Sequence, residues 1–402
     1  MARNSLPQRV RRELYGFARR LATPFSDSRR RRFLTDMVAG MVIANHVHLT
    51  EVARAISGGC QPIHGIEKRL SLHLGSAAWD PSPLADRLLR DAAALVNDDT
   101  LIVADTSDLA KYYARKLEGL GRVHDGSDPE KRTAPGYALF EAYVRAGRWQ
   151  LFPLRVELLK TYAGAATSEN EEILRHVVAI HRAAGGKGTW VLDRGFDRRN
   201  LFGPLVARDV AFVARLVGDR HVLSADGRTL TPRALAEEWR PASWPRGRRA
   251  LRGQVACHPV RLPEVSEQEF LLVAHFRGPA REPLLLLVSP AARRPRRTGR
   301  WYVRAYRRRW GVEDATRGIK QQFRLEAFLV RSWRSIARLL WLVAWAFWWL
   351  NLWGEERLAP LREALLSHPW RLPKRVIYVF DWIARQVHDL LYPRPIIEMP
   401  SG

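Results

Sequence analysis

Two short apolar runs that each end in an aspartate constrain the fold of this chain more than any other feature. TLIVADTS spans residues 100–107, and GTWVLDRGFD spans residues 188–197. Asp105 and Asp193 each follow four mainly apolar residues, which is typical of a buried strand. We therefore expect both carboxylates to project where a strand meets solvent, and ligand and metal sites of α/β sheets collect at such strand ends.

The residues around these runs predict the rest of an α/β unit with a mixed sheet, spanning residues 99–217. Residues 136–159 alternate in polarity and contain a turn near Ala146, which indicates a β-hairpin. Residues 168–186 are typical of a capped amphipathic helix, and residues 210–217 of a further strand.

Composition divides the remainder of the chain into four regions. Residues 1–98 are helical in pattern. Residues 218–300 are rich in Pro, Gly and Arg, contain short strand-like pieces and predict a β-rich insertion. Residues 301–354 return to a helical pattern and would complete the core, and residues 355–402 form a helical tail with several prolines.

The charge of the chain indicates a polyanionic partner. Lys and Arg number 66 against 41 Asp and Glu, which gives a formal net charge of +25. Self-repulsion of this size destabilises a compact state unless a polyanion offsets it, so DNA or RNA is the first candidate and an anionic membrane the second. Cys60 and Cys257 are far apart and lack metal-site spacing, which fits a reducing cytoplasm.

Residues 47–75 have the outline of a helix-turn-helix. The pattern predicts a short helix capped by Thr50, a break at Gly58-Gly59 and a longer helix from about Pro62. Any small helical bundle contains such pairs, so the interpretation gains weight mainly from charge: the first 36 residues hold ten arginines against three acids.

The most apolar stretch, LLWLVAWAFWWLNLW at residues 339–353, raises the question of a membrane. Its 15 residues fall short of the ~20 that span the hydrocarbon core of a bilayer. Arg338 precedes it and Asn351 lies inside it. We expect a buried core helix, with a membrane-associated segment as the alternative.

The stretch YRRRWGVEDATRGIKQQF, residues 306–323, places an isolated acid within a basic helix. At about 100° per residue, one face of a single helix would carry Tyr306, Arg309, Glu313, Arg317 and Lys320. The opposite, buried side would carry Val312, Ala315, Ile319 and Phe323. A ladder of i,i+4 ion pairs between Glu313 and its two arginine neighbours is one explanation. It leaves most of the positive charge unexplained, because residues 293–338 hold 15 Arg and Lys against three acids. That surplus suits a phosphate backbone.

Together, Asp105, Asp193 and Glu313 would supply hard oxygen ligands of the kind that Mg²⁺ or Mn²⁺ prefers. Two such ions can activate a water or 3′-hydroxyl and stabilise the leaving oxygen in phosphodiester displacement. The alternative for each aspartate is a turn or capping role, and Asp108, Asp125, Asp128 and Asp197 are nearby competitors.

These residues resemble the DDE transposases of bacterial insertion sequences, in the group with a YREK signature named after the fourth insertion-sequence family. The spacing Tyr-x2-Arg-x3-Glu-x6-Lys is met by Tyr306, Arg309, Glu313 and Lys320. VLDRGF at residues 191–196 is similar to the second-aspartate motif of the family, and IVADTS at residues 102–107 is similar to the first.

The resemblance implies an RNase H-like catalytic core interrupted by the β-rich insertion, preceded by a helical DNA-binding region. It implies metal binding by Asp105, Asp193 and Glu313, and DNA contacts by Tyr306, Arg309 and Lys320, with Arg317 among the surrounding cations. The activity implied is Mg²⁺-dependent cleavage at terminal inverted repeats and joining of the 3′ ends to target DNA. Pairing two DNA ends would require a dimer on DNA, in the cytoplasm at the nucleoid.

Two further interpretations stay open. A nuclease of the same fold would use the same carboxylates without joining strands. A non-catalytic DNA-binding relative would lack or misplace one of the three acids, whereas all three are present in this sequence.

Overall fold

The computed structural model describes most of the chain. It covers residues 5–58, 62–124, 130, 132–147, 150–163, 167–244, 253–279, 281–366 and 379–392. The side chains of Asp314, Ala315 and Arg317 lie outside the described part, as do Asp125 and Asp128.

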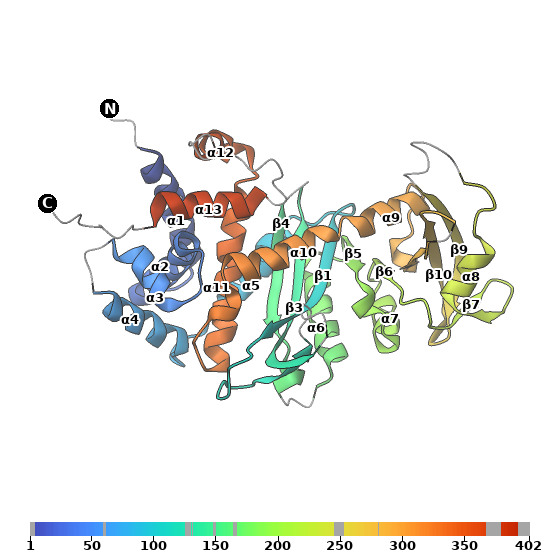
Figure 1. The fold of residues 1–402 in the computed structure, drawn as a ribbon, viewed down its shortest axis with the longest axis horizontal. Helices are drawn as coiled ribbons and strands as arrows, with labels where there is room; N and C mark the ends of the chain where they lie inside the picture. Colours follow the sequence, from blue (N-terminus) through green and yellow to red (C-terminus); the bar gives the residue numbers. More distant parts are fainter. Residues whose placement is uncertain are drawn as a thin grey trace.

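One long sheet runs through the middle of the molecule (Figure 1). Its core strands are β1 (Leu101–Ala110), β2 (Gly121–His124), β3 (Thr133–Arg145), β4 (Leu151–Leu158), β5 (Thr189–Leu192) and β6 (Phe212–Arg215). β4, β3 and β1 pair antiparallel, and β1, β5 and β6 pair parallel. The order β4-β3-β1-β5-β6 is that of an RNase H-like core, so the predicted α/β class with a mixed sheet is confirmed.

The apolar runs form the central strands because both faces of the sheet are covered. All four residues of β5 are buried, as are the first four of β1. β3 and β4 form the predicted hairpin, closed by a hydrogen bond of 3.2 Å from Ala146 N to Gln150 O. The helix between β4 and β5, α6 (Glu169–Ala183), begins with a capping box formed by Ser168 and Glu171, as its sequence indicates.

The β-rich insertion continues the same sheet. Its main strands are β7 (Val222–Ser224), β8 (Thr229–Leu230), β9 (Gln254–Leu262), β10 (Val265–Phe276) and β11 (Leu284–Val288), with α8 (Pro232–Glu238) beside them. β11 pairs antiparallel with β6 of the core, over Leu286–Val288 and Val213–Arg215. The insertion therefore extends the sheet of the core at the end far from the helical regions (Figure 1).

The terminal helices lie toward the other end of the molecule (Figure 1), with the helix Ser82–Ala93 packed against β4 of the sheet. They are α1 (Leu6–Ala22), α2 (Ser28–Ala44), α3 (Leu49–Ser57), α4 (Ile63–Gly75) and α5 (Ser82–Ala93) from the N-terminal region, and α12 (Ala359–Leu366) and α13 (Val379–Leu391) from the tail. α13 packs on α2, and α12 packs on α1. The expected short helix of the helix-turn-helix is present as α3, but His48, and not Thr50, is its N-cap, since Leu49 already lies in the helix with its side chain buried.

The apolar stretch forms α11 (Trp333–Leu352), which is long and apolar enough to cross a membrane by length and composition. However, 89% of its most apolar window is buried inside the structure, as expected for a core helix. It contacts β4 of the sheet as well as α2 and α4 of the N-terminal region. Arg338 reinforces that junction by donating to the carbonyls of Leu74 (2.8 Å), Ser76 (2.7 Å) and Trp79 (3.0 Å).

The basic stretch is not the single regular helix that its sequence predicts. It forms α9 (Gly299–Arg307), α10 (Trp310–Arg317) and a π-helical turn at Gly318–Gln322. Between α9 and α10 the backbone tightens, with i to i+3 hydrogen bonds from Arg309 N to Tyr306 O (2.9 Å) and from Val312 N to Arg309 O (2.7 Å). The predicted buried side is confirmed for Val312, Ile319 and Phe323, which are all fully buried.

Candidate active site

Asp105 and Asp193 end up side by side because their strands are in register. β1 and β5 are parallel, with Ala104 paired to Leu192, and each aspartate is the next residue of the chain. Asp105 is an interior residue of β1, and Asp193 directly follows the last residue of β5. Neighbouring parallel strands lie about 4.8 Å apart, so the two carboxylates emerge from adjacent positions at one edge of the sheet. Both apolar runs therefore form neighbouring parallel strands, but only Asp193 stands where its strand ends. Asp105 lies within β1, which continues to Ala110, and the role of both carboxylates stays a prediction.

Asp193 is also a turn residue, as the alternative interpretation proposed. Its Oδ1 accepts a hydrogen bond of 2.6 Å from Gly195 N at the start of a short 3₁₀ helix, Arg194–Phe196. A Cβ added to Gly195 would lie 3.0 Å from that oxygen and 4.0 Å from Thr106 Oγ1. The loop after β5 is therefore packed directly against the residue that follows Asp105, and the capping bond holds the Asp193 carboxylate in place.

The pKa of Asp105 reflects its burial and the carboxylates close to it. Burial, together with the neighbouring carboxylates of Asp193 and Glu141, raises the pKa of Asp105 to about 7. The Arg309 guanidinium and the backbone amide of Thr106 act in the opposite direction. A carboxylate held among like charges in this way favours a proton or a cation.

Arg309 connects this pair of aspartates to Glu313. Its Nη2 donates a hydrogen bond of 2.7 Å to Glu313 Oε1, so one ion pair of the expected i,i+4 ladder is present. Burial by itself lowers the pKa of Arg309, but Tyr306, Asp193 and Asp105 raise it by a greater amount. The Arg309 side chain is only 8% exposed, against 39% for Glu313. Arg309 is therefore a buried cation between the aspartates and the glutamate.

The predicted DNA-contacting face is mostly turned inward. Tyr306 is 4% exposed and Arg309 is 6% exposed, because the tight turn between α9 and α10 directs Arg309 toward the strand ends. Lys320 Nζ donates to the backbone carbonyl of Asp108 on β1 and so ties the π-helical turn to the sheet. The side chain of Arg317 lies outside the described residues. The expectation of one open face carrying all five side chains is wrong in this respect.

Of the competing acids, Asp197 is engaged away from the two aspartates. Asp197 pairs with Arg220 of the insertion and accepts a hydrogen bond of 2.8 Å from Val217 N. The backbone carbonyl of Asp108 accepts a hydrogen bond from Lys320 Nζ. Asp125 and Asp128 lie outside the described residues.

Glu141 is a fourth carboxyl group at the site, and sequence reasoning missed it. It pairs with Asp105 across β3 and β1 and is fully buried. Its Oε2 accepts from Ser107 Oγ (2.6 Å) and Thr316 Oγ1 (3.3 Å), and its Oε1 accepts from the Tyr143 hydroxyl (2.8 Å). Because Thr316 lies one turn beyond Glu313 on α10, Glu141 links the strand of the first aspartate to the helix of the glutamate. A single charge inside the apolar run ALFEAYV was the available signal.

Two of the three predicted metal ligands, Asp105 and Asp193, are placed where they could bind a divalent cation. Asp105 and Asp193 offer adjacent carboxylates in an acidic environment, which is the chemistry that Mg²⁺ and Mn²⁺ prefer. Within the described part of the chain, however, no three His, Cys, Asp or Glu side chains lie close enough to hold one ion together. Glu313 is paired with Arg309, which also lies near the two aspartates.

Residues 162–349 match the family model described as Transposase DDE domain. The match supports a DDE transposase. It includes Asp193 and Glu313 and begins after Asp105. No curated protein matches the chain. Among solved structures, a piggyBac transposase in a synaptic complex with hairpin DNA, studied by cryo-EM, is similar at a TM-score of 0.47 and 11% identity, over 95% of this chain and 77% of that one.

Proposed function

We propose that this DDE transposase cleaves DNA at the terminal inverted repeats of an insertion sequence and joins the 3′ ends to target DNA. The observation that carries the proposal is the adjacency of Asp105, within β1, and Asp193, directly after the parallel strand β5, with Arg309 close to both and paired with Glu313. The spacing of Tyr306, Arg309, Glu313 and Lys320 favours the YREK group.

Asp105, Asp193 and Glu313 are the residues that would hold Mg²⁺ or Mn²⁺, as a pair of ions. When bound, such ions supply an activated water or 3′-hydroxyl and charge stabilisation at the leaving oxygen. The chain itself fixes Asp193 through the amide of Gly195 and aligns α10 with β1 through Glu141.

Arg309 has two roles in this proposal. Without DNA it offsets the charge of the two aspartates and occupies Glu313. A phosphate of the bound strand is a strong alternative partner for a guanidinium, since it can accept two parallel hydrogen bonds. A phosphate that takes Arg309 would release Glu313 toward Asp105 and Asp193, so DNA binding would complete the set of carboxylates.

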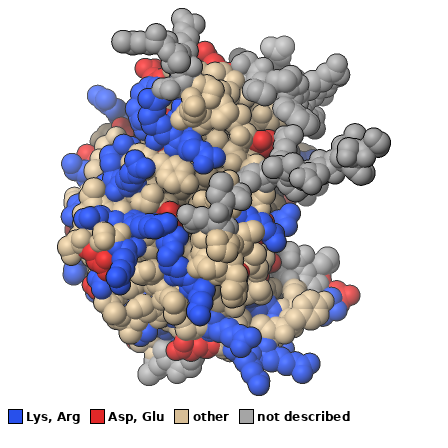
Figure 2. Space-filling model, turned by 90° about the vertical axis from the view of Figure 1, so that its left-hand side faces the viewer, with Lys and Arg blue, Asp and Glu red and all other residues tan. Residues whose placement is uncertain are grey.

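The N-terminal region is the proposed site of DNA binding. Exposed arginines line α1 and the start of α2: Arg9, Arg11, Arg12, Arg19, Arg20, Arg29, Arg31 and Arg32. Figure 2 shows that, on the face at this end of the molecule, Lys and Arg are far more prominent than Asp and Glu and gather in bands. The pair α3 and α4 would enter the DNA groove in the manner of a helix-turn-helix. Bringing two DNA ends together would require a dimer, acting in the cytoplasm at the nucleoid.

The test is cleavage of a DNA fragment that carries the repeats flanking the gene. Asp105→Asn, Asp193→Asn and Glu313→Gln should each abolish Mg²⁺-dependent cleavage while leaving DNA affinity within about twofold, since none removes a cation. Glu267→Gln, at an exposed acid of β10 in the insertion, is the matched control and should cleave normally. Wild-type cleavage rates from Glu313→Gln would refute the proposed site.

A plasmid target separates the remaining alternatives. A transposase should yield products in which the released 3′ ends are joined to the plasmid. Cleavage without any joined product would identify a nuclease of the same fold. Tight, salt-dependent binding without cleavage in either Mg²⁺ or Mn²⁺ would identify a DNA-binding relative.

A further inference from the structure

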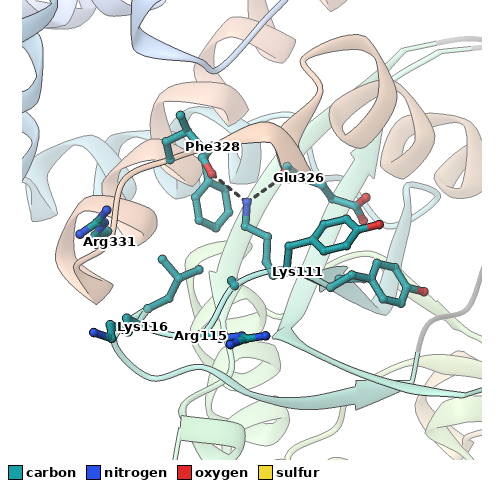
Figure 3. A pocket seen from close by; sticks show the side chains of 12 residues that line it. Lys111, Arg115, Lys116, Glu326, Phe328 and Arg331 are labelled. Carbon is teal, nitrogen blue, oxygen red and sulfur yellow. Dashed lines mark hydrogen bonds between the residues drawn. The ribbon is translucent and has the colours of Figure 1, made fainter.

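A groove of about 720 Å³ lies beyond the far end of β1. One wall is the segment 110–117, which follows β1, and the other is formed by Glu326, Phe328, Leu329 and Arg331 (Figure 3). Lys111 joins the two walls, because its Nζ donates to the carbonyls of Glu326 (2.6 Å) and Phe328 (2.7 Å). It also lies 3.7 Å from the centre of the Phe328 ring. The groove is thus a fixed part of the fold.

The groove presents large apolar side chains to solvent. Tyr113 is 99% exposed, Tyr112 is 54% exposed and Leu329 is 71% exposed. A tyrosine ring that is fully solvated gains nothing from burial in this chain, so packing does not account for it. Clustered exposed apolar side chains of this kind mark interaction surfaces.

The rim of the groove is basic. Arg115, Lys116 and Arg331 are exposed, and within the described part of the chain they form no ion pair. Figure 3 shows Arg115, Lys116 and Arg331 on the same side of Lys111. Glu118 is engaged elsewhere, since its Oε2 accepts a hydrogen bond of 2.9 Å from Trp333 N at the start of α11. The groove therefore offers aromatic rings bordered by cations that are available to an anionic partner.

The groove and the candidate active site are connected by the same two chain segments. The chain from Glu313 to Phe328 runs alongside the chain from Asp105 to Lys111, joined by Thr316 to Glu141 and by Lys320 to Asp108. Five residues of strand separate Asp105 from Ala110, a length of about 17 Å at about 3.4 Å per residue. A stacked DNA strand also advances about 3.4 Å per nucleotide, so this length equals about five nucleotides.

The groove also continues toward the N-terminal helices. A second hollow of about 390 Å³ shares Phe328, Leu329 and Arg331 with it. The other side of that hollow is formed by the start of α3 at His48 and Leu49, and by α4 at Glu67 and Ser71. A continuous path therefore leads from the α3–α4 pair, past the groove, to the two chain segments that lead to the candidate active site.

We propose that the groove binds an unpaired stretch of DNA, about five nucleotides from the part of the strand that lies at the candidate active site. Tyr113 stacks on a base, while Arg115, Lys116 and Arg331 hold the adjoining phosphates. Aromatic rings between cations are how proteins bind single strands without reading sequence. In a duplex the bases are stacked on one another, so only the phosphates could contact this groove. The inference rests on the proposed function, because it places the groove relative to a DNA strand at Asp105.

The test compares one fluorescent 20-nucleotide single strand with its duplex, using fluorescence anisotropy and the full chain. Tyr113→Ala should weaken single-strand binding about tenfold, the equivalent of roughly 1.4 kcal/mol for one lost stack. Duplex binding should stay within about twofold. Tyr113→Phe keeps the ring and should restore single-strand binding, which a merely structural defect would not predict.

Two cation variants complete the design. Arg115→Gln with Lys116→Gln should reduce the salt dependence of single-strand binding by about two phosphate contacts. Lys187 is an exposed lysine just before the start of β5, at the opposite end of that strand from Asp193. Lys187→Gln should leave the salt dependence of single-strand binding unchanged. Equal losses on both DNA forms with Tyr113→Ala, or no loss on either, would overturn the groove as a site for unpaired DNA. Wild-type protein that binds neither form would instead refute the proposed function itself.

Discussion

Arg309 donates a hydrogen bond of 2.7 Å to Glu313 while it lies close enough to Asp105 and Asp193 for both aspartates to raise its pKa. One buried guanidinium thus serves three carboxylates that come from two strands and one helix. In the proposed mechanism, the positive charge of Arg309 reduces the repulsion between these carboxylates before DNA and metal bind. This arrangement also means that the site is assembled in two steps, with Glu313 joining last.

Replacing Arg309 should destabilise the metal-free protein. Arg309→Gln would leave Asp105 and Asp193 without their cation, and we expect a loss of about 2 kcal/mol in the free energy of unfolding. The share that comes from Glu313 is small, because its side chain is 39% exposed and solvent screens it. Urea unfolding in EDTA measures the loss, and Mg²⁺ should recover more of it in the variant than in wild type. Arg182→Gln, at an exposed position of α6, is the control, and equal stability of the two variants would contradict the prediction.

Asp105 should make the metal-free protein less stable as pH rises. Its pKa is about 7 in the folded chain against an ordinary value of 3.8, so the folded state holds a proton that the unfolded state has lost. The stabilisation is complete below about pH 4 and disappears as pH rises through about 7. Urea unfolding of wild type and Asp105→Asn at pH 5 and pH 8 checks the sign. Relative to Asp105→Asn, wild type should lose about 2 kcal/mol over that interval; a constant difference would refute the shift.

Glu141 should matter for both stability and cleavage. Glu141→Ala leaves the hydroxyls of Ser107, Tyr143 and Thr316 without their acceptor and should cost about 2–4 kcal/mol. Thr316→Val removes only the link to α10, so it should cost about 1 kcal/mol yet slow cleavage, because Glu313 is on that helix. Tyr143→Phe is the matched control, with a similar loss of stability and normal cleavage. Parallel rate losses in Thr316→Val and Tyr143→Phe would show that α10 alignment is not what Glu141 provides.

Arg338 should hold the N-terminal helices to the core. Burial, together with the nearby Arg334, lowers the pKa of Arg338 to about 10, while Asp80 acts in the opposite direction. Its guanidinium serves three carbonyls between Leu74 and Trp79. Arg338→Met keeps the length but leaves those carbonyls unpaired, so we expect a loss of about 2–4 kcal/mol. Limited proteolysis should then cut residues 75–82 faster, whereas Arg334→Met, at an exposed position on the same helix, should not change that rate.

The strands and the two aspartates could be predicted from sequence because their signals are local. An apolar run of four residues followed by a carboxylate is typical of a buried strand, and β1 and β5 both contain such a run, although β1 continues beyond Asp105 to Ala110. α6 has a complete capping signature, and the 3.6-residue period placed Val312, Ile319 and Phe323 on the buried side. These features depend on residues within a few positions of one another.

Glu141 and the orientation of Arg309 could not be predicted in the same way. Glu141 is one acid in an apolar strand, and its partners Ser107, Tyr143 and Thr316 are distant in sequence or on other elements. Arg309 turns inward only because the backbone tightens between α9 and α10 beside strand ends that are more than 100 residues away. Local periodicity assumes a regular helix and therefore assigned Arg309 to an open face.

By itself, the sequence determined the class of fold, the apolar segments of the two central strands and the presence of three separated acids, because each depends on short-range polarity and turn chemistry. Only the tertiary structure decided that Asp105 and Asp193 lie on neighbouring segments, that Arg309 pairs with Glu313 close to both aspartates, and that Tyr113 is exposed in a basic groove. Strand register and helix packing set these distances, and both depend on contacts between residues far apart in the chain.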